Sequence, residues 1–509
     1  MNDLVIILPI LLPIAGGILG LLLAKRSKIQ SFIGIATSAL GVLVAGLLLH
    51  TVSVHNIISL ELGNWEAPFG ISFIADKLAA LMVGVSALVA LGISIYSIDD
   101  LKASARSQWF YPLTLFLIAG VNGAFLTADL FNLYVWFEVM LIASFALMTV
   151  GGSKPQFEGG FKYVAINLVA SALFLAGLGL LYGKLGTLNM ADAALKLSQL
   201  EDASLVNSSA VLFLVAFSIK AGLFPFFFWL PASYHTPPIA ISALFAGLLT
   251  KVGVYALLRC FTLVFTQDTS FLLGSIFVLS LATMVTGVLG AASRFDLKQI
   301  LSFHIISQIG YMTLGLAIFS QLAIAAAIFY TIHHIIVKTN LFLISGIIAR
   351  RTGSHSLKHI GGLYKTAPYL ALLFFIPAFS LGGIPPLSGF WAKFALIKAT
   401  LNEAHYWAAA IALLVGIMTL YSMTKIWGEA FWKASPNTTD TKKSEFGYSG
   451  LASYMPTIAF ALITLGIGFH SQPLFSFAQE AAYQLLNPEH YINQLLSTDY
   501  VVAVTQAAP

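Results

Sequence analysis

The chain has 509 residues, of which 58% are hydrophobic and 9% are charged. An ordinary soluble domain carries roughly 25% charged residues, so this composition excludes a soluble protein for most of the chain. The net charge of +5 is small for this length and gives no reason to expect a nucleic-acid partner. Cys260 is the only cysteine, which excludes a disulfide framework and a Cys-X-X-Cys cluster site.

Apolar segments long enough to be membrane helices recur along the whole chain. A hydrocarbon core about 30 Å thick needs about 20 helical residues, and these segments do not alternate polar with apolar residues as barrel strands do. We therefore predict an all-α polytopic membrane protein with about fourteen transmembrane helices. The predicted spans lie near residues 3–24, 29–50, 71–97, 110–128, 130–150, 161–182, 207–231, 237–260, 271–291, 300–318, 321–348, 368–398, 406–427 and 453–470.

Lysine and arginine are concentrated in the loops on one side of the predicted membrane. If the N-terminus lies outside, these loops are cytoplasmic, as the positive-inside rule requires. The tail after Gln472 contains no lysine or arginine, which suits an exported segment. We therefore expect a multi-pass membrane protein with both termini extracytoplasmic. The bases on the predicted cytoplasmic side are Lys25, Arg26, Lys28, Lys102, Arg106, Lys154, Lys162, Arg294, Lys298, Arg350, Arg351, Lys358, Lys365, Lys433, Lys442 and Lys443.

Five ionisable residues stand alone inside apolar segments: Glu138, Lys220, Lys251, Lys338 and Lys393. Inserting a charged residue at bilayer depth costs roughly 2.5 to 3.5 kcal/mol of free energy on insertion scales. Five such residues in one chain therefore indicate a shared function. The usual reason is a path for ions or protons through the membrane. Two alternatives stay open: a buried ion pair that only holds helices together and, for Lys338, a side chain that reaches the membrane surface.

Two predicted helices, the seventh and the twelfth, are interrupted by glycine and proline. The interrupting residues are Gly222, Pro225, Gly383, Pro385 and Pro386, and a lysine lies within about two turns of each interruption. Proline removes a helical hydrogen bond and glycine loosens the backbone, so we predict that both helices break near the membrane centre. A single kink is often packing geometry alone. A pair of corresponding kinks in two halves is typical of inverted repeats around an ion site.

The interruptions divide the predicted helices into four regions. Each break follows a run of intact spans, so helices 4–8 and 9–13 form two five-helix repeats of opposite orientation. The predicted regions are residues 1–109 with helices 1–3, residues 110–260 with the first repeat, residues 271–427 with the second, inverted repeat, and residues 428–509 with the last helix and an extracytoplasmic tail.

Histidines and charged residues near helix ends are secondary candidates. His333 and His334 are adjacent and point about 100° apart on a helix, so at most one faces the same interior as Lys338. The offset from Lys338 favours His334. The two histidines diverge and have no carboxylate or thiol within one turn, which argues against a metal site. The sequence also contains no GxxxxGK[ST] loop for nucleotide phosphates. We therefore predict no metal, no cofactor, no catalytic residue and no enzyme. The remaining candidates, which are more often ordinary anchors near a membrane surface, are His304, Lys298, Asp76 and Lys77.

These residues stand in long motifs that resemble one known family. The segments are DLFNLYVWFEVMLIASFALM around Glu138, FSIKAGLFPFFFWLPASYHTPPIAISALFAGLLTKVGVYALLR around Lys220 and Lys251, TIHHIIVKTNLFLISG around Lys338, and GIPPLSGFWAKF around Lys393. Over nearly the whole chain they resemble the antiporter-like subunits shared by Mrp-type sodium/proton antiporters and the proton-pumping arm of respiratory complex I. Within that family, the lysine at 393, where other members place glutamate, and the short tail PEHYINQLL are similar to the D-type branch of Mrp subunits.

The resemblance implies a relay of proton-carrying groups along the membrane centre. It also implies a hetero-oligomer in the cell membrane of a prokaryote, with other membrane subunits including a larger homologous subunit, that exchanges Na⁺ for H⁺. Two rival functions stay open: a redox-driven subunit of complex I or a membrane hydrogenase, and a structural membrane subunit whose buried charges hold partners together. The implied order of the relay is Glu138, Lys220, Lys251, His334, Lys338 and Lys393, with Glu138 paired to Lys220 and Lys393 on the exit side.

Overall fold

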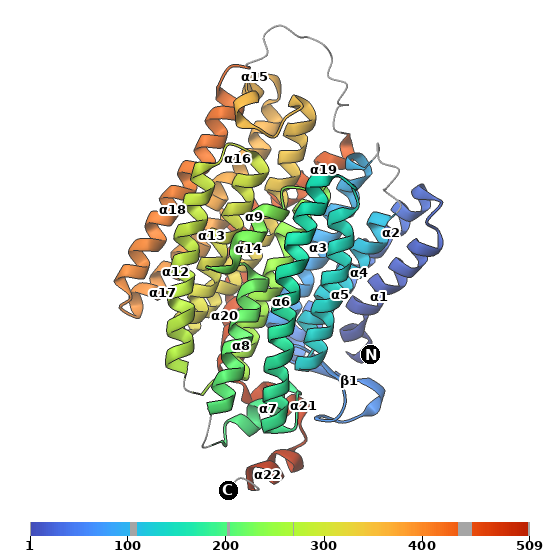
Figure 1. Cartoon of the computed structure of the whole chain (residues 1–509), viewed down its shortest axis with the longest axis vertical. Helices are drawn as coiled ribbons and strands as arrows, with labels where there is room; N and C mark the ends of the chain where they lie inside the picture. The colour runs from blue at the N-terminus through green and yellow to red at the C-terminus, as the bar shows by residue number, and fades with distance from the viewer. Residues whose placement is uncertain (1, 102–108, 201–203, 268, 436–449, 507–509) are drawn as a thin grey trace.

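The computed structural model of the protein describes residues 2–101, 109–200, 204–267, 269–435 and 450–506. Over these residues the chain is mainly helical, and the long helices run side by side in one bundle (Figure 1). Four of the bases that predict the orientation lie outside the described residues: Lys102, Arg106, Lys442 and Lys443.

The first part of the chain forms six long helices, one short helix and a two-stranded sheet. Strand β1 (Ile58–Glu61) pairs antiparallel with β2 (Ser72–Ala75), and Ile58 lies opposite Ala75. The helices are α1 (Asn2–Leu22), α2 (Ser27–His55), α3 (Lys77–Asp100), α4 (Phe110–Leu126), α5 (Leu130–Thr149), α6 (Lys154–Leu185) and the short α7 (Met190–Leu197).

The second part contains both interrupted helices and a helical tail. The elements are α8 (Ser204–Ala221), α9 (Trp229–Ser233), α10 (Ile239–Leu244), the π-helical segment η4 (Phe245–Leu249), α11 (Thr250–Leu263), α12 (Thr269–Ser293), α13 (Leu297–Ile318), α14 (Gln321–Thr352), α15 (Leu363–Thr366), α16 (Pro368–Gly382), α17 (Ser388–Asn402), α18 (Tyr406–Trp427), α19 (Leu451–Phe469), α20 (Gln472–Leu486), α21 (Glu489–Leu495) and α22 (Thr498–Gln506).

Twelve helical segments in the described part of the chain are long and apolar enough to cross a membrane. Two shorter apolar helices match the remaining predicted spans: α4 coincides with the span near 110–128, and α16 covers the first part of the span near 368–398, whose second part lies in α17. The prediction of an all-α polytopic membrane protein is therefore confirmed. The count of fourteen crossings stays a prediction, because it depends on how these two shorter helices lie in the bilayer.

The start of the third predicted span differs from the structure. By hydropathy, residues 71–76 could extend the predicted helix. In the structure, Ser72–Ala75 instead forms strand β2, which pairs with β1. Helix α3 begins only at Lys77, because Asp76 is its N-cap and accepts a hydrogen bond of 2.9 Å from the Ala79 N–H. Aspartate is among the preferred N-cap residues, so the local sequence favours this later start.

Three segments lie at the centre of the bundle. The apolar windows of Ile239–Leu263, Leu297–Ile318 and Gln321–Thr352 are 94% to 100% buried, compared with 28% for Ser27–His55. Polar side chains on these central segments therefore contact protein rather than lipid, which lowers the cost of placing them at membrane depth.

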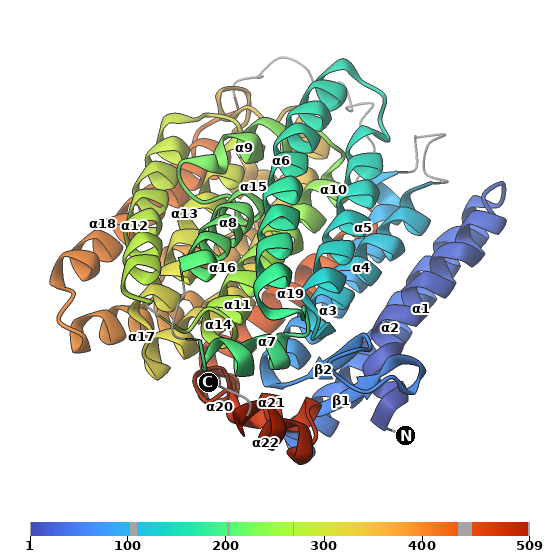
Figure 2. The same ribbon diagram turned by 60° about the horizontal axis from the view of Figure 1, so that its bottom comes forward.

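The two ends of the bundle carry different structures. Both termini, β1, α7 and the tail helices α21 and α22 lie at one end, and α15 lies at the other (Figure 1). Figure 2 shows α20–α22 gathered beside the β1–β2 sheet and α7. We refer to this end as the terminal end. The tail, predicted only as a short extension, is thus three helices that pack against the bundle.

Candidate functional site

Both interrupted helices end in the same backbone motif. Gly222 has φ of 82° and Gly383 has φ of 90°, in the left-handed region that glycine tolerates best. At the first break the N–H groups of Gly222 and Leu223 both donate to the Ser218 carbonyl at 2.9 Å. At the second, those of Gly383 and Ile384 both donate to the Phe379 carbonyl at 3.1 Å. This is a common glycine helix ending, so each glycine stops its helix.

Proline then keeps each helix from resuming at once. Pro225 follows Gly222, and Pro385 with Pro386 follows Gly383, before α9 and α17 begin. A proline ring removes the backbone donor that a continuing helix needs. The structure therefore shows a break in each of the two predicted helices, and the position of the breaks near the membrane centre stays a prediction.

Glu138, Ser171 and Lys220 form a polar group between α5, α6 and α8. The Ser171 hydroxyl donates to Glu138 Oε1, and Lys220 Nζ donates to Ser171 Oγ at 3.1 Å. Lys220 is buried, and its ammonium lies 5.2 Å from the centre of the Phe137 ring. The structure thus brings the predicted pair together through a serine. The signal in the sequence was a hydroxyl within the apolar stretch of α6.

A small cavity adjoins Lys220. Its volume is about 20 Å³, and Tyr163, Asn167, Trp229 and Tyr234 are among its lining residues. A cavity of this size has room for about one water molecule. The Tyr234 hydroxyl is buried without a hydrogen-bond partner in the described part of the chain, so it offers a polar group to such a water.

Lys251 is fully buried at the start of α11. Its Nζ donates to the Ala246 carbonyl, which belongs to the π-helical segment η4. π-helical turns are frequent at functional sites because they change the hydrogen-bond pattern of the helix. Here the local change places a carbonyl within reach of a buried ammonium.

The two other central lysines also rest on carbonyl groups. Lys338 Nζ, on α14, donates to the Leu301 carbonyl at 3.0 Å. Lys393 Nζ, on α17, donates to the carbonyls of Leu381 at 2.9 Å and Gly382 at 3.2 Å. These last two carbonyls close α16, so Lys393 lies at the negative end of that helix.

The adjacent histidines have different environments. His333 Nδ1 lies 2.8 Å from Ser388 Oγ at the start of α17, and Ser388 Oγ lies 3.1 Å from Ser380 Oγ. His334 is buried, the charges of Lys251 and Lys338 act on it, and neither of its ring nitrogens has a partner within the described ranges. The second break is therefore contacted by His333, whereas the sequence favoured His334 for that link.

Several buried polar atoms on α8 and on the three central segments lack hydrogen-bond partners among the residues that the structure describes. Buried polar groups are almost always paired with protein or ordered water, so these atoms indicate hydration along the same helices as the lysines. They belong to Ser218 on α8, Thr250 on α11, His304 and Gln308 on α13, and His334, Thr339 and Asn340 on α14.

The residues predicted as surface anchors are buried as well. Lys298 Nζ donates to the Pro237 carbonyl at 2.7 Å, and Asp76 pairs with Arg259 at 2.6 Å. Lys77 pairs with Glu480 of the tail helix α20. Loops and tail helices cover these helix ends, which the sequence does not indicate. Arg259 and Glu480 were missed for the same reason.

Two histidines lie in loops beside Lys298, at the end opposite the termini. Burial, with the charge of Lys298 as a second cause, lowers the pKa of His355 to about 4. Burial also lowers the pKa of His235, whose Nδ1 lies 2.7 Å from the Pro231 carbonyl. Both rings are therefore neutral at physiological pH.

The comparisons with known proteins agree with this geometry. The profile of the family described as NADH:quinone oxidoreductase/Mrp antiporter, TM, matches residues 127–419. The D-type Na(+)/H(+) antiporter subunit of Alkalihalophilus pseudofirmus is 49% identical over 502 residues, which cover 97% of this chain and 100% of that protein. The protein of the same name from Bacillus subtilis is 41% identical over 496 residues, with coverage of 97% and 100%.

A solved structure gives the same answer for the fold. A chain in the structure of the Mrp complex from Dietzia sp. DQ12-45-1b has a TM-score of 0.91 and 34% sequence identity, and the match covers 97% of this chain and 99% of that one. The predicted resemblance is therefore confirmed. The chain belongs to the family of antiporter-like membrane proteins described as NADH:quinone oxidoreductase/Mrp antiporter.

Proposed function

We propose that this chain is the proton-translocating subunit of a hetero-oligomeric Na⁺/H⁺ antiporter. Two curated relatives that cover 97% of the chain are named as Na(+)/H(+) antiporter subunits, which favours this function over the redox-driven alternative. The match to a chain of the Mrp complex supports a place among other membrane subunits. A larger homologous subunit among them is proposed from the resemblance of the sequence motifs alone.

The observation that carries the proposal is the excess of central lysines over central carboxylates. Lys251, Lys338 and Lys393 donate to backbone carbonyls, and Lys220 alone of the four has a nearby carboxylate. Bundles held together by buried charge need opposite charges in close pairs, because an uncompensated buried charge is strongly destabilising. A lysine that donates to neutral backbone carbonyls, with no carboxylate partner, can hold a proton in one state and release it in another.

Glu138 and Lys220 form the part of the path that can switch. At an effective dielectric constant of about 20, opposite charges in direct contact, about 4 Å apart, attract by about 4 kcal/mol. Ser171 stands between the Glu138 carboxylate and the Lys220 ammonium, so their attraction is smaller than this value. Moving the Glu138 carboxylate away from Ser171 removes this attraction, so Lys220 releases its proton more readily. An ion that moves in a neighbouring subunit could bias the switch through its charge.

Unpaired polar atoms then give the released proton a route. His304 and His334 offer ring nitrogens, and Thr250 offers a hydroxyl, all buried on the central helices. Water between such groups forms hydrogen-bonded chains along which a proton can move. We place His333 at the far end of this route, because it contacts Ser388 beside the second break.

Matching features at opposite ends support the inverted repeats. Asp129 caps α5 and pairs with Asn189 in an isolated β-bridge, and Asp296 caps α13 and pairs in the same way with Ser356. The first aspartate follows Thr127, which bridges to β2 at the terminal end, and α13 starts at the opposite end. The proposed repeats are residues 110–260 and 271–427, with residues 1–109 and 428–509 outside them.

We propose that the terminal end faces the extracytoplasmic side. The loops at the opposite end contain most of the lysine and arginine residues, as the positive-inside rule requires of the cytoplasmic side. A reporter fused after Pro509 should be extracytoplasmic, and one inserted after Ser435 should be cytoplasmic. If both report the same side, the proposed topology is wrong.

The function is tested in the reconstituted complex. A sodium gradient imposed across the vesicles should drive proton movement, and Lys251→Met should abolish it while the complex still assembles. Lys398→Met makes the same change at an exposed lysine of α17 and should keep wild-type transport. Loss of assembly with Lys251→Met would favour the structural alternative, and wild-type transport would contradict the relay.

A further inference from the structure

A hollow opens at the terminal end, apart from the central lysines. Its volume is about 710 Å³, far above the roughly 30 Å³ that one water molecule occupies in the liquid. It lies between the end of α2, the starts of α3 and α14, and the tail helices α20 and α21. Residues that line it include Asn56, Lys77, Gln321, Glu480, Gln484 and His490.

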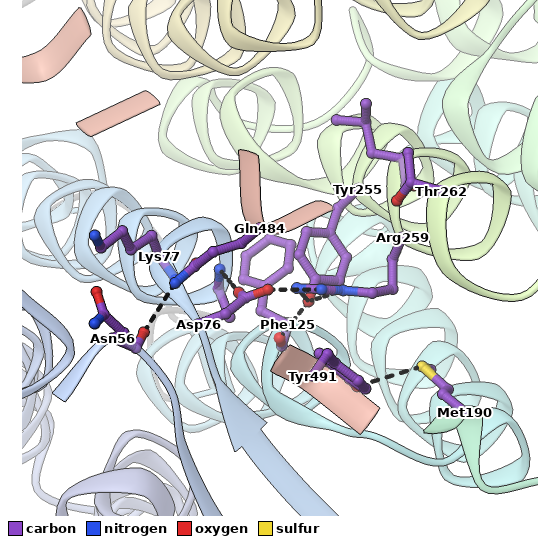
Figure 3. Close-up of polar contacts among 12 residues, drawn as sticks. Asn56, Asp76, Lys77, Phe125, Met190, Tyr255, Arg259, Thr262, Gln484 and Tyr491 are labelled. Atoms are coloured by element: carbon purple, nitrogen blue, oxygen red, sulfur yellow. Dashed lines mark hydrogen bonds and ion pairs between the residues drawn. The ribbon is translucent and has the colours of Figure 1, made fainter. Parts of the chain in front are cut away.

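An ion pair forms one wall of the hollow. Lys77 is buried, with 8% of its side chain exposed, whereas 57% of the side chain of its partner Glu480 is exposed. The Lys77 N–H also donates to Gln484 Oε1 at 3.0 Å, and Gln484 Nε2 donates to the Asn56 carbonyl at 3.2 Å (Figure 3). The tail helix α20 therefore closes the inner side of the hollow with one accessible carboxylate.

A second ion pair lies directly behind the first. Asp76 precedes Lys77 in the chain, and its carboxylate pairs with Arg259 of α11, with only 2% and 3% of the two side chains exposed. Arg259 also donates to the Tyr255 hydroxyl, and the Tyr491 ring of α21 lies 5.2 Å from its guanidinium (Figure 3). Two carboxylates thus lie in sequence from the hollow into the bundle.

Helix α11 joins these pairs to the central path. Lys251, Tyr255 and Arg259 are spaced four residues apart, so they follow one side of the helix. Eight residues of helix span about 12 Å. The Tyr255 hydroxyl contacts Arg259 and donates to the Phe125 carbonyl at 2.6 Å, which fixes it between the two ends. A polar stripe therefore runs from Lys251 to the Asp76–Arg259 pair.

We propose that this stripe and the two ion pairs form a proton port between the hollow and Lys251. This inference rests on the proposed function and adds the place where the path meets water. A hydronium ion in the hollow gives its proton to Glu480, which leaves water and a neutral carboxyl group. Neutral Glu480 attracts Lys77 less strongly, and its proton passes to Asp76, so that Glu480 is ionised again and neutral Asp76 loosens from Arg259. From Asp76 the proton passes by way of the Tyr255 hydroxyl, which accepts one proton and releases another, to neutral Lys251, which becomes an ammonium group.

The two bases of the port remain as counter-charges. Arginine stays protonated in proteins, so Arg259 cannot carry the proton and instead stabilises ionised Asp76. Lys77 does the same for Glu480. The cationic side chains also oppose the passage of hydrated Na⁺, so the port selects protons carried by carboxyl groups over free metal cations.

Two conservative variants test the port. Glu480→Gln and Asp76→Asn keep a hydrogen-bond acceptor for Lys77 and Arg259, and asparagine also caps helices well, so folding is kept. Neither amide carries a proton, so we expect about a tenfold loss of sodium-driven proton transport in each assembled complex. Matched controls are Glu403→Gln at an exposed carboxylate after α17 and Asp129→Asn at the N-cap of α5.

A thiol in the hollow tests access. The one cysteine of the chain, Cys260, is buried, so Cys260→Ala gives a background for Gln484→Cys. A charged thiol reagent that does not cross membranes should label Gln484→Cys from one side only and reduce transport about tenfold. Full labelling without loss of transport would overturn the port.

The outcome also separates this inference from the proposed function. Wild-type transport by Glu480→Gln and Asp76→Asn, in a complex where Lys251→Met is inactive, would overturn the port and leave the central relay standing. Wild-type transport by Lys251→Met would instead contradict the relay itself. A role of Glu480 in packing alone predicts an active Gln variant, because the amide preserves the contact with Lys77.

Discussion

The two broken helices have the same backbone ending and different side-chain partners. At the first break the Ile219 carbonyl accepts from the neutral indole of Trp229 at 3.1 Å. At the second, the Leu381 and Gly382 carbonyls accept from the Lys393 ammonium. Lys220, close to the first break, turns instead toward Ser171.

The position of the lysine relative to the glycine explains this difference. Lys220 precedes Gly222 on the helix that ends there, and its side chain reaches α6 through Ser171. Lys393 follows Gly383 on the next helix, so it folds back onto the negative end of α16. One backbone motif therefore lies beside a serine-bridged glutamate and lysine in one place and beside a lysine held by carbonyl dipoles in the other.

The largest effect is expected where the switch is removed. Glu138→Ala and Lys220→Ala should each lower sodium-dependent proton transport by more than about a hundredfold in everted vesicles, because each leaves the other charge without its partner. The complex should still assemble. Glu158→Ala and Lys162→Ala, which break an exposed ion pair on α6, should keep transport. Normal transport by either of the first two variants would refute the switch.

Reversal of the charge at the second break should have the next largest effect. Lys393→Glu places a carboxylate against two carbonyl oxygens, so we expect loss of coupling or an altered pH dependence of transport. Lys393→Arg keeps the positive charge but does not deprotonate in practice, so the complex should assemble while transport falls about tenfold. If the Lys393→Arg variant transports at the wild-type rate across the pH range, Lys393 is a fixed charge that carries no proton. The two breaks would then differ in side-chain contacts and not in function.

A smaller effect is expected at the serine that bridges the first pair. Ser171→Ala removes the hydroxyl between Glu138 and Lys220, and transport should fall several-fold because the two charges can still approach each other. Ser171→Thr should restore most of the rate. Ser275→Ala removes a serine that bonds only its own helix and serves as the control. An unchanged rate with Ser171→Ala would show that the bridge has no part in transport.

The smallest effect on transport is expected at Trp229, whose neutral indole donates to the Ile219 carbonyl at the first break. Trp229→Phe removes the indole donor from the Ile219 carbonyl, which still accepts from the Gly222 N–H at 3.2 Å, so stability should fall by only about 1 kcal/mol while transport continues. Thermal inactivation of the purified complex measures this loss. Trp407→Phe changes a tryptophan that is 85% exposed and should leave the inactivation temperature unchanged. If Trp229→Phe instead abolishes transport, the two breaks do not differ as described.

The sequence predicts the parts of the site that stand out against an apolar background. Lys251 is visible because a charge interrupts a hydrophobic run, and Gly383 because glycine and proline cluster there. Partners far apart in the chain are not visible in this way: Ser171 lies 49 residues from Lys220, and Glu480 lies 403 residues from Lys77. Only the packing of α6 and α20 brings these groups together.

The β1–β2 sheet was missed for a related reason. Residues 73–75 are apolar and lead into α3, so hydropathy alone assigns them to that helix. Asp76, a preferred N-cap residue, was the local signal for a later start. The same aspartate, read as an ordinary anchor, is the partner of Arg259.

The near-complete enclosure of α11, α13 and α14 by other helices separates the proposed proton path from the bilayer. Since their apolar windows are at least 94% buried, lipid chains do not solvate the groups on them. A thicker or thinner membrane acts on the outer helices, where mismatch costs fractions of a kcal/mol per Å. The surrounding protein, rather than the lipid, therefore sets the dielectric environment of these groups. The rate of proton transport should be the same in lipids of different chain length.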